Sequence, residues 1–98
     1  MSVLGNYTKQ PNEIETYSIS YNDDLTVNDN LTGSATVTVA PAGLVVDYST
    51  VIDAPGDHRV RVKVSGGTSG VKYKVTVLVN TADGRRLEDE FYVKIKDY

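Results

Sequence analysis

The residues of this chain that could do chemistry are few, and they lack the partners that catalysis needs. The single histidine, His58, follows Pro55-Gly56-Asp57 at the start of a strand-like segment, and the chain contains no cysteine. A catalytic histidine needs a nucleophile and an orienting group, and a zinc site needs further ligands at short spacing. No such spacing surrounds His58. We therefore expect no enzyme activity from this residue.

Two other segments that resemble functional motifs are explained by local structure. Glu88, Asp89 and Glu90 are consecutive, and neighbouring residues of a strand point to opposite faces, so they form no paired-carboxylate site. Asp89 falls on the inward side in this register, and we expect a bulge or the nearby turn to expose it. The glycine-rich segment at 65–70 lacks the lysine of a phosphate loop and the spacing of a nucleophile elbow. It is predicted to be a connector.

An acidic segment at residues 22–30 is the remaining candidate ligand site. It contains six Asn and Asp side chains, and such oxygen atoms are the ligands that calcium prefers. The segment lacks the spacing of an EF-hand loop and its closing glutamate. Asn and Asp also favour turns, because their side chains bond to the nearby backbone. We expect a solvated turn, with no metal and no cofactor.

Composition and charge argue against several functions. The 98 residues fit one domain, and 40% hydrophobic with 23% charged residues is typical of a folded globular protein. The net charge of −3 and the lack of a long basic run argue against nucleic-acid binding. No apolar stretch is long enough to cross a membrane, and the chain begins without a signal-peptide pattern. We expect no membrane contact and synthesis in the cytoplasm.

The elements that must position any functional surface are predicted to be strands. Fifteen valines and ten threonines dominate the composition, and no segment has apolar residues at helical spacing. Turn residues separate six or seven short alternating segments, including an Asp83-Gly84 hairpin signal, which predicts an antiparallel β-sandwich with a small closed barrel as the alternative. The expected strands are 13–21, 35–39, 44–48 with a possible second piece at 50–52, 58–65, 71–79 and 85–96.

The first twelve residues have no partner in this strand pattern. They contain isolated apolar residues and a proline, so we assign 1–12 to an extended N-terminal arm and 13–98 to a single β-sandwich domain. Such an arm either lies along a neighbouring subunit or is a disordered terminus. Deleting it is then expected to leave the fold intact and to abolish assembly. Its candidate contact residues are Val3, Leu4, Tyr7, Lys9 and Pro11.

Charge is distributed unevenly along the chain. Residues 1–57 carry eight acidic residues and one basic residue, whereas residues 58–98 carry nine basic and five acidic residues. If the strands at 58–65 and 71–79 pair, their outward cations share one sheet face. Such a face is either simply solvated or meets the acidic half of another copy in a head-to-tail contact. The cations are Arg59, Arg61, Lys63, Lys72 and Lys74.

A glycine and a tyrosine mark the start of the strand expected after residue 70. Gly70 stands three residues before Tyr73, and the segments 79–84 and 91–95 follow. This pattern resembles the last two strands of bacterial immunoglobulin-like domains. The resemblance implies an immunoglobulin-like sandwich in which Tyr73 forms a tyrosine corner, its hydroxyl bonding to nearby backbone. The alternative is an ordinary core tyrosine with its tip at the surface.

Further short motifs are spread over most of the chain. They are Lys9-Gln10-Pro11, Tyr17-Ser18-Ile19-Ser20-Tyr21 with Leu25, Ser65-Gly66-Gly67 with Gly70, Tyr73-Lys74-Val75-Thr76, and Thr81 with Gly84-Arg85 and Glu88. Together these motifs resemble small tailed-phage virion proteins of the fiber-tail adaptor type. The chain departs from that pattern at Ser20, where Asp is usual, at Tyr21, which is often Trp, and at the turn 28–31.

The resemblance implies a non-enzymatic structural protein of the virion. Such a protein links tail or head components to fibers through protein–protein contacts, with other virion proteins and further copies of itself as partners. The alternatives are an immunoglobulin-like recognition module that binds a host-surface glycan or protein, and a capsid decoration protein. Sugar sites usually present exposed aromatic rings, and this chain has no tryptophan.

Overall fold

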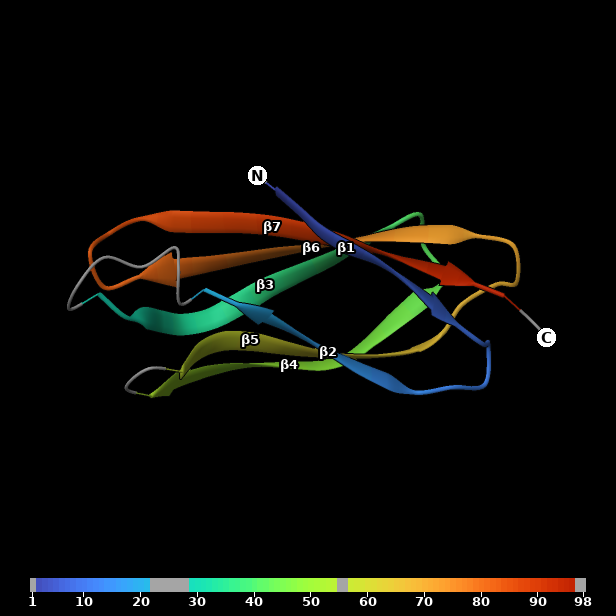
Figure 1. The fold of residues 1–98 in the computed structure, drawn as a ribbon, viewed down its shortest axis with the longest axis horizontal. Coiled ribbons are helices and arrows are strands. Elements are labelled where there is room, and N and C mark those ends of the chain that lie inside the picture. The colour runs from blue at the N-terminus through green and yellow to red at the C-terminus, as the bar shows by residue number, and fades with distance from the viewer. Residues whose placement is uncertain (1, 22–28, 55–56, 97–98) are drawn as a thin grey trace.

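The protein folds into two β-sheets that pack face to face (Figure 1). The computed structural model describes residues 2–21, 29–54 and 57–96, and for residues 2–4 it describes the backbone. All regular secondary structure in these residues is β-strand, which confirms the all-β prediction. The strands are β1 (Ser2–Lys9), β2 (Glu15–Ser20), β3 (Leu31–Ala40), β4 (Leu44–Ala54), β5 (Asp57–Gly66), β6 (Lys72–Thr81) and β7 (Arg86–Ile95).

The strands are divided between a four-stranded and a three-stranded sheet. Their orders are β1-β7-β6-β3 and β2-β5-β4. Every neighbouring pair is antiparallel except β1 and β7, which run parallel. The predicted sandwich of mostly antiparallel strands is confirmed, and the closed barrel is wrong. Immunoglobulin domains divide their second to seventh strands in the same way, but place the first strand beside the second.

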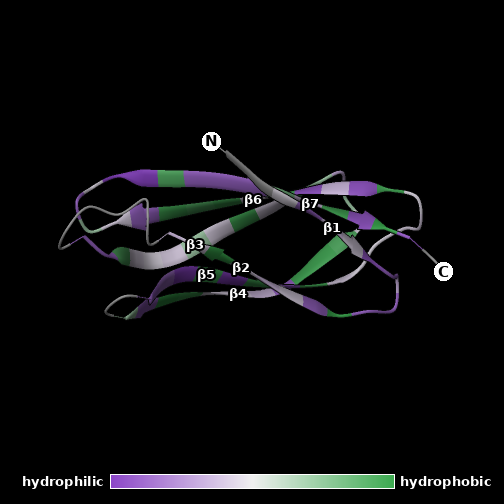
Figure 2. Ribbon diagram, in the orientation of Figure 1, coloured by the Kyte–Doolittle hydropathy of each residue, from purple (hydrophilic) through white to green (hydrophobic). Residues whose placement is uncertain are grey.

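The core lies between the sheets and is built mainly from valine. On β5, Val60, Val62 and Val64 are fully buried, and the alternate residues of β6 and β7 are buried against them. Figure 2 shows hydrophobic and hydrophilic residues alternating along the strands. Alternation puts one face of each sheet inward and the other in solvent. The outer faces of the two sheets are therefore the surfaces on which polar and charged residues gather.

The strands β5 and β6 lie in different sheets, which corrects the predicted pairing between them. Residues 66–71 carry the chain from the three-stranded to the four-stranded sheet. Gly67 makes this crossover possible, because its φ of +100° favours glycine and a Cβ there would lie 2.5 Å from Ile95 Cγ1. The five cations expected on one face are consequently separated. Arg59, Arg61 and Lys63 belong to one sheet, whereas Lys72 and Lys74 belong to the other.

Most of the segment expected to be an arm is an edge strand. Residues 2–9 form β1, whose partners on β7 run from Asp89 to Ile95, with a register shift between Val3 and Asn6. The sequence pattern missed this strand because pairing at an edge depends on backbone groups, and β1 has no regular alternation of apolar residues. Figure 1 shows β1 crossing the front of the molecule beside β7.

Two smaller expectations also change. The strand β4 is continuous over eleven residues, and a register shift between Val46 and Tyr48 replaces the predicted break. Asp89 is buried, not exposed by a bulge or turn. It is paired with Val77 on one side and with Ser2 on the other. Asp89 is on the same inward face of β7 as Phe91, opposite the buried Val77, and this position explains why it is buried.

Candidate docking surfaces

Lys9 is buried, so the structure removes it from the predicted set of surface contact residues. The residue is 1% exposed, and its Nζ donates to the carbonyl oxygens of Gly66 at 2.7 Å, Gln10 at 2.8 Å and Pro11 at 3.4 Å. Burial lowers the pKa of Lys9, while the negative charges of Glu13 and Glu15 act in the opposite direction. The ammonium group thus joins the turn after β1 to the end of β5.

The other residues of the predicted arm also serve the fold. The ring of Tyr7 packs against Tyr17 and Phe91, with centroids 4.6 Å and 5.8 Å apart. Tyr7 is still 39% exposed, and it closes the gap between the sheets at their β1 and β2 edges. Val3 and Leu4 lie on β1, but the structure does not describe their side chains. Pro11 is half-buried in the turn that Lys9 stabilises.

Tyr17 has the most strongly perturbed hydroxyl of this edge. Burial raises the pKa of Tyr17 to about 12, and the neighbouring charges of Glu15 and Glu13 add to this effect. The phenol is therefore neutral throughout the physiological range. It acts as part of an aromatic cluster with Tyr7 and Phe91.

Asp29 anchors the opposite end of the sandwich. Its Oδ1 accepts hydrogen bonds from the backbone N–H groups of Asn30 and Asp83, both at 2.9 Å, and its Oδ2 accepts from Arg85 Nη2 at 3.3 Å. Burial opposes ionisation, but these donors and the Thr81 hydroxyl outweigh it and hold the pKa of Asp29 below its usual range. The carboxylate fixes the turn between β6 and β7.

This arrangement bears on the acidic segment considered as a calcium site. Residues 22–28 lie outside the described part of the chain, whereas the oxygens of Asp29 are engaged by N–H donors. Across the described ranges, no group of three or more His, Asp or Glu side chains is arranged to hold a metal ion.

No helix in the part of the chain that the structure describes is long and apolar enough to cross a membrane.

His58 is paired with a carboxylate. Its Nδ1 lies 2.5 Å from Asp53 Oδ1, and the same oxygen accepts a hydrogen bond from the backbone N–H of Leu31 at 3.2 Å. Asp53 and His58 face each other across β4 and β5. The pair therefore ties this hairpin to the start of β3, which is a structural role.

A row of cations occupies the outer face of the three-stranded sheet. Arg59, Arg61 and Lys63 alternate with buried valines along β5, the central strand. Arg59 lies 3.2 Å from Asp57, whereas no carboxylate among the described residues lies within ion-pair distance of Arg61 or Lys63. Hydroxyl-bearing residues flank the row, and they are Thr16, Ser18, Ser20 and Thr50.

Three exposed apolar side chains lie on β4 or directly before β2, the two strands that flank β5. Ile14, Val45 and Tyr48 are 61%, 53% and 46% exposed. Val45 is paired with Ser65 and Tyr48 with Lys63, so the bulge between them puts both side chains on the outer face. These residues were not predicted from the sequence. The adjacent apolar pair Val45-Val46, followed by Asp47, does indicate a break in the alternation of inward and outward residues. We call the cationic row with Ile14, Val45 and Tyr48 the docking face.

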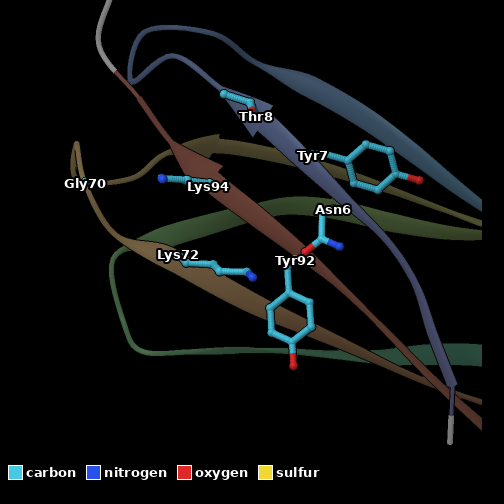
Figure 3. A pocket seen from close by; sticks show the side chains of 7 residues that line it. All are labelled: Asn6, Tyr7, Thr8, Gly70, Lys72, Tyr92 and Lys94. Carbon is cyan, nitrogen blue, oxygen red and sulfur yellow. The ribbon is translucent and has the colours of Figure 1, made fainter.

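The outer face of the four-stranded sheet is more evenly charged. Lys74 Nζ lies 3.7 Å from Glu90 Oε2, and Lys72 Nζ lies 4.6 Å from the centre of the Tyr92 ring. Near one end, this face is hollowed by a pocket of about 540 Å³. Figure 3 shows the side chains around it. The pocket is lined by Asn6, Tyr7, Thr8, Gly70, Lys72, Tyr92 and Lys94.

The predicted hydrogen bond of Tyr73 is confirmed. Tyr73 is buried, and its hydroxyl accepts a hydrogen bond from the backbone N–H of Thr68 at 2.9 Å. A Cβ on Gly43 would lie 2.6 Å from that oxygen. The tyrosine therefore holds the crossover segment in place from within the core, and contributes no accessible surface.

Two solved structures are similar to the chain over almost its whole length. The crystal structure of the cysteine protease inhibitor EhICP2 from Entamoeba histolytica has a TM-score of 0.45 and 7% identity, and the match covers 95% of this chain and 96% of that chain. The solution structure of Amebosin has a TM-score of 0.44 and 13% identity, with 97% of both chains covered. The search of curated protein sequences found no match.

A comparison with protein families confirms the resemblance to fiber-tail adaptors. The family described as podophage GP4 fiber-tail adaptor protein gp77 matches residues 9–94. The match includes β2 to β6 in full and β7 up to Lys94, but only the last residue of β1. It covers most of the 98 residues, so the chain belongs to the podophage GP4 fiber-tail adaptor family and is a structural protein of a phage virion.

Proposed function

We propose that this protein is a non-enzymatic adaptor that joins tail components to fibers through protein–protein contacts. The family supports a role among tail proteins. The docking face is the observation from which we infer which surface of the protein makes the contact. Interfaces combine apolar residues, which are buried on contact, with charges that steer and orient the partner. Ile14, Val45 and Tyr48 supply the first component, and Arg61 and Lys63 supply the second.

The chemistry of this face defines its partner. Exposed aliphatic side chains and a tyrosine accompany the cations of the three-stranded sheet. The complementary surface is an apolar patch bordered by Asp or Glu. Since the cations lie on the central strand, the sheet fixes their spacing along the backbone, and binding orders only their side chains.

Incorporation of variants into virions tests this proposal. Arg61→Glu reverses one charge on the docking face, and Arg86→Glu makes the same change on the other sheet, where Arg86 Nε donates only an exposed bond to Asn80 Oδ1. We expect Arg61→Glu to reduce the number of copies per particle by about tenfold, as a loss of about 1.4 kcal/mol of binding requires. Arg86→Glu is expected to incorporate normally.

Copies are counted by mass spectrometry of virions from complemented phage, and thermal melting of each purified variant establishes that it folds. Normal incorporation of a folded Arg61→Glu variant would contradict the assignment of this face. Equal loss with both variants would show that net charge matters and the location of the charge does not.

We further propose that copies of the adaptor associate with one another through opposite charges. Glu13 is an exposed carboxylate in the segment between β1 and β2, whereas the cations Arg59, Arg61 and Lys63 lie along β5. A contact between two different patches is heterologous, and it closes into a ring when the rotation permits. Sedimentation of the purified protein is expected to show oligomers that dissociate as salt is added. A monomer at every concentration and ionic strength would refute self-association.

A further inference from the structure

Two lysines line the pocket on the four-stranded sheet. Lys72 and Lys94 occupy directly opposite positions on β6 and β7, and both line the pocket. Like charges at opposite positions of an antiparallel pair destabilise a sheet. Among the described residues, no carboxylate lies within ion-pair distance of either lysine. Further along the same face, Lys74 is paired with Glu90, which distinguishes it from the two lysines of the pocket.

Hydrogen-bond donors surround the two lysines. Asn6 and Thr8 contribute an amide and a hydroxyl from β1, and Tyr92 contributes a phenol from β7. Figure 3 shows Asn6, Lys72 and Tyr92 close to one another beside β1. Ammonium, amide and hydroxyl groups together are suited to carboxylate oxygens, which accept several hydrogen bonds at once.

The Tyr92 ring argues for a peptide and against a sugar. Sugars usually stack on an open aromatic face, but Lys72 Nζ already lies over the Tyr92 ring. The Tyr7 ring packs toward Tyr17 and Phe91, although Tyr7 contributes to the lining. Three of the lining residues, Asn6, Tyr7 and Thr8, belong to β1, the edge strand of this sheet. The pocket therefore borders the sheet edge, where an extended chain with acidic side chains can lie beside β1 and the two lysines.

We propose that the pocket binds the carboxylate side chains of an acidic peptide segment of a partner protein. This site lies on the opposite sheet from the docking face. It therefore does not depend on the function proposed for that face. An adaptor with two binding sites on opposite sheets is able to hold two partners at once.

The experiment is a titration of the isolated protein, followed by NMR of the backbone amides. The probe is a short peptide of alternating glutamate and serine, and the same peptide with glutamine in place of glutamate is the control. We expect shift changes at residues 6–8, 70–72 and 92–94 with the acidic peptide alone. Lys72→Gln and Lys94→Gln are each expected to weaken binding by about tenfold or more, and added salt weakens it further.

A matched variant separates this site from a general effect of charge. Arg86→Gln removes a positive charge from the same sheet but outside the pocket lining, and it is expected to leave peptide binding at the pocket unchanged. The proposal is overturned if the glutamine peptide binds equally well, or if Arg86→Gln weakens binding as much as Lys72→Gln. Tighter binding of glucuronate than of the peptide would also overturn it, because the site would then be one for an acidic sugar. Because virions are not used, this result is separate from the incorporation test.

Discussion

The two ends of the sandwich are held by buried ions of opposite sign. At one end, the Lys9 ammonium donates to the carbonyl oxygens of Gln10, Pro11 and Gly66. At the other end, the Asp29 carboxylate accepts from the N–H groups of Asn30 and Asp83 and from Arg85. The molecule is 45 Å long, so each ion acts on its own set of turns.

The difference between the Lys9 end and the Asp29 end shows how backbone groups outside the strand ladders obtain hydrogen-bond partners. Buried N–H and C=O groups need partners, and a cation supplies donors whereas an anion supplies acceptors. These ions and their partners include several of the residues that carry the family resemblance, among them Lys9, Gly66, Thr81 and Arg85. The motifs therefore hold the fold, and the docking face and the pocket are built largely from other residues.

Removing β1 is expected to have the largest effect. Deletion of residues 1–9 takes away the parallel ladder to β7, the Lys9 ammonium and the cover over Phe91 and Tyr17. We expect the free energy of unfolding to fall by about 4 kcal/mol or more, measured by urea denaturation. This reverses the earlier expectation that an arm could be removed without harm. An unchanged midpoint would show that β1 contributes no stability.

Lys9 itself is expected to have the next largest effect. Lys9→Ala leaves the carbonyls of Gly66 and Gln10 without their donor, and it should cost about 2 to 3 kcal/mol in denaturant unfolding. Lys9→Met keeps the apolar stem and removes the charge. If the bonds of the ammonium matter, Lys9→Met remains destabilised, whereas wild-type stability in Lys9→Met would assign the effect to packing of the stem.

Asp29 is expected to make the stability of its end sensitive to acid. Its pKa is lowered from 3.8, so its contribution is complete above that value and is lost as the pH falls through the folded-state pKa. Asp29→Asn keeps the shape and should lower Tm by roughly 5 °C at neutral pH. The difference in Tm between the two proteins should shrink as the pH falls from 5 to 2. A difference in Tm that stays constant with pH would mean that the ionised carboxylate of Asp29 is not the source of its stabilising effect.

Substitution of Tyr73 is expected to have a smaller effect on stability, at the same end of the sandwich as Lys9. Tyr73→Phe removes the acceptor for the Thr68 N–H and should cost about 1 kcal/mol, which for a domain of this size corresponds to a fall in Tm of roughly 4 °C. Tyr48→Phe, on the docking face, is the matched control and should leave Tm unchanged. Equal effects of the two variants would contradict a special role for the buried hydroxyl.

Tyr17 offers the smallest and most local test of this edge. Because its pKa is raised to about 12 from 10.0, folding is favoured below pH 10, and this contribution is lost between pH 10 and about 12. Absorbance titration of the phenols should show a late phase that is missing in Tyr17→Phe. A late phase that persists in the variant would assign it to another tyrosine.

Alternation predicted the strands, but it did not predict their partners. The segments 58–65, 71–79 and 85–96 correspond closely to β5, β6 and β7, and the Asp83-Gly84 turn follows Thr81 as expected. The separation of β5 from β6 depends on packing across the sandwich, which local periodicity does not contain. For the same reason, only part of the candidate site was found. The cations of β5 were predicted to face outward, whereas Ile14, Val45 and the pocket residues of β1 became visible only in the folded chain.

The amino-acid sequence alone determined the β class, the outward direction of the charged residues and the family resemblance, because these depend on residue type and spacing of two along a strand. Tertiary structure alone decided that five cations are divided between two opposite faces. It also decided that Lys9 is an internal link and that β1 closes an edge of the sheet. Each of these outcomes rests on pairing between residues distant in the chain, and such pairing is selected by burial and hydrogen bonding over the whole molecule.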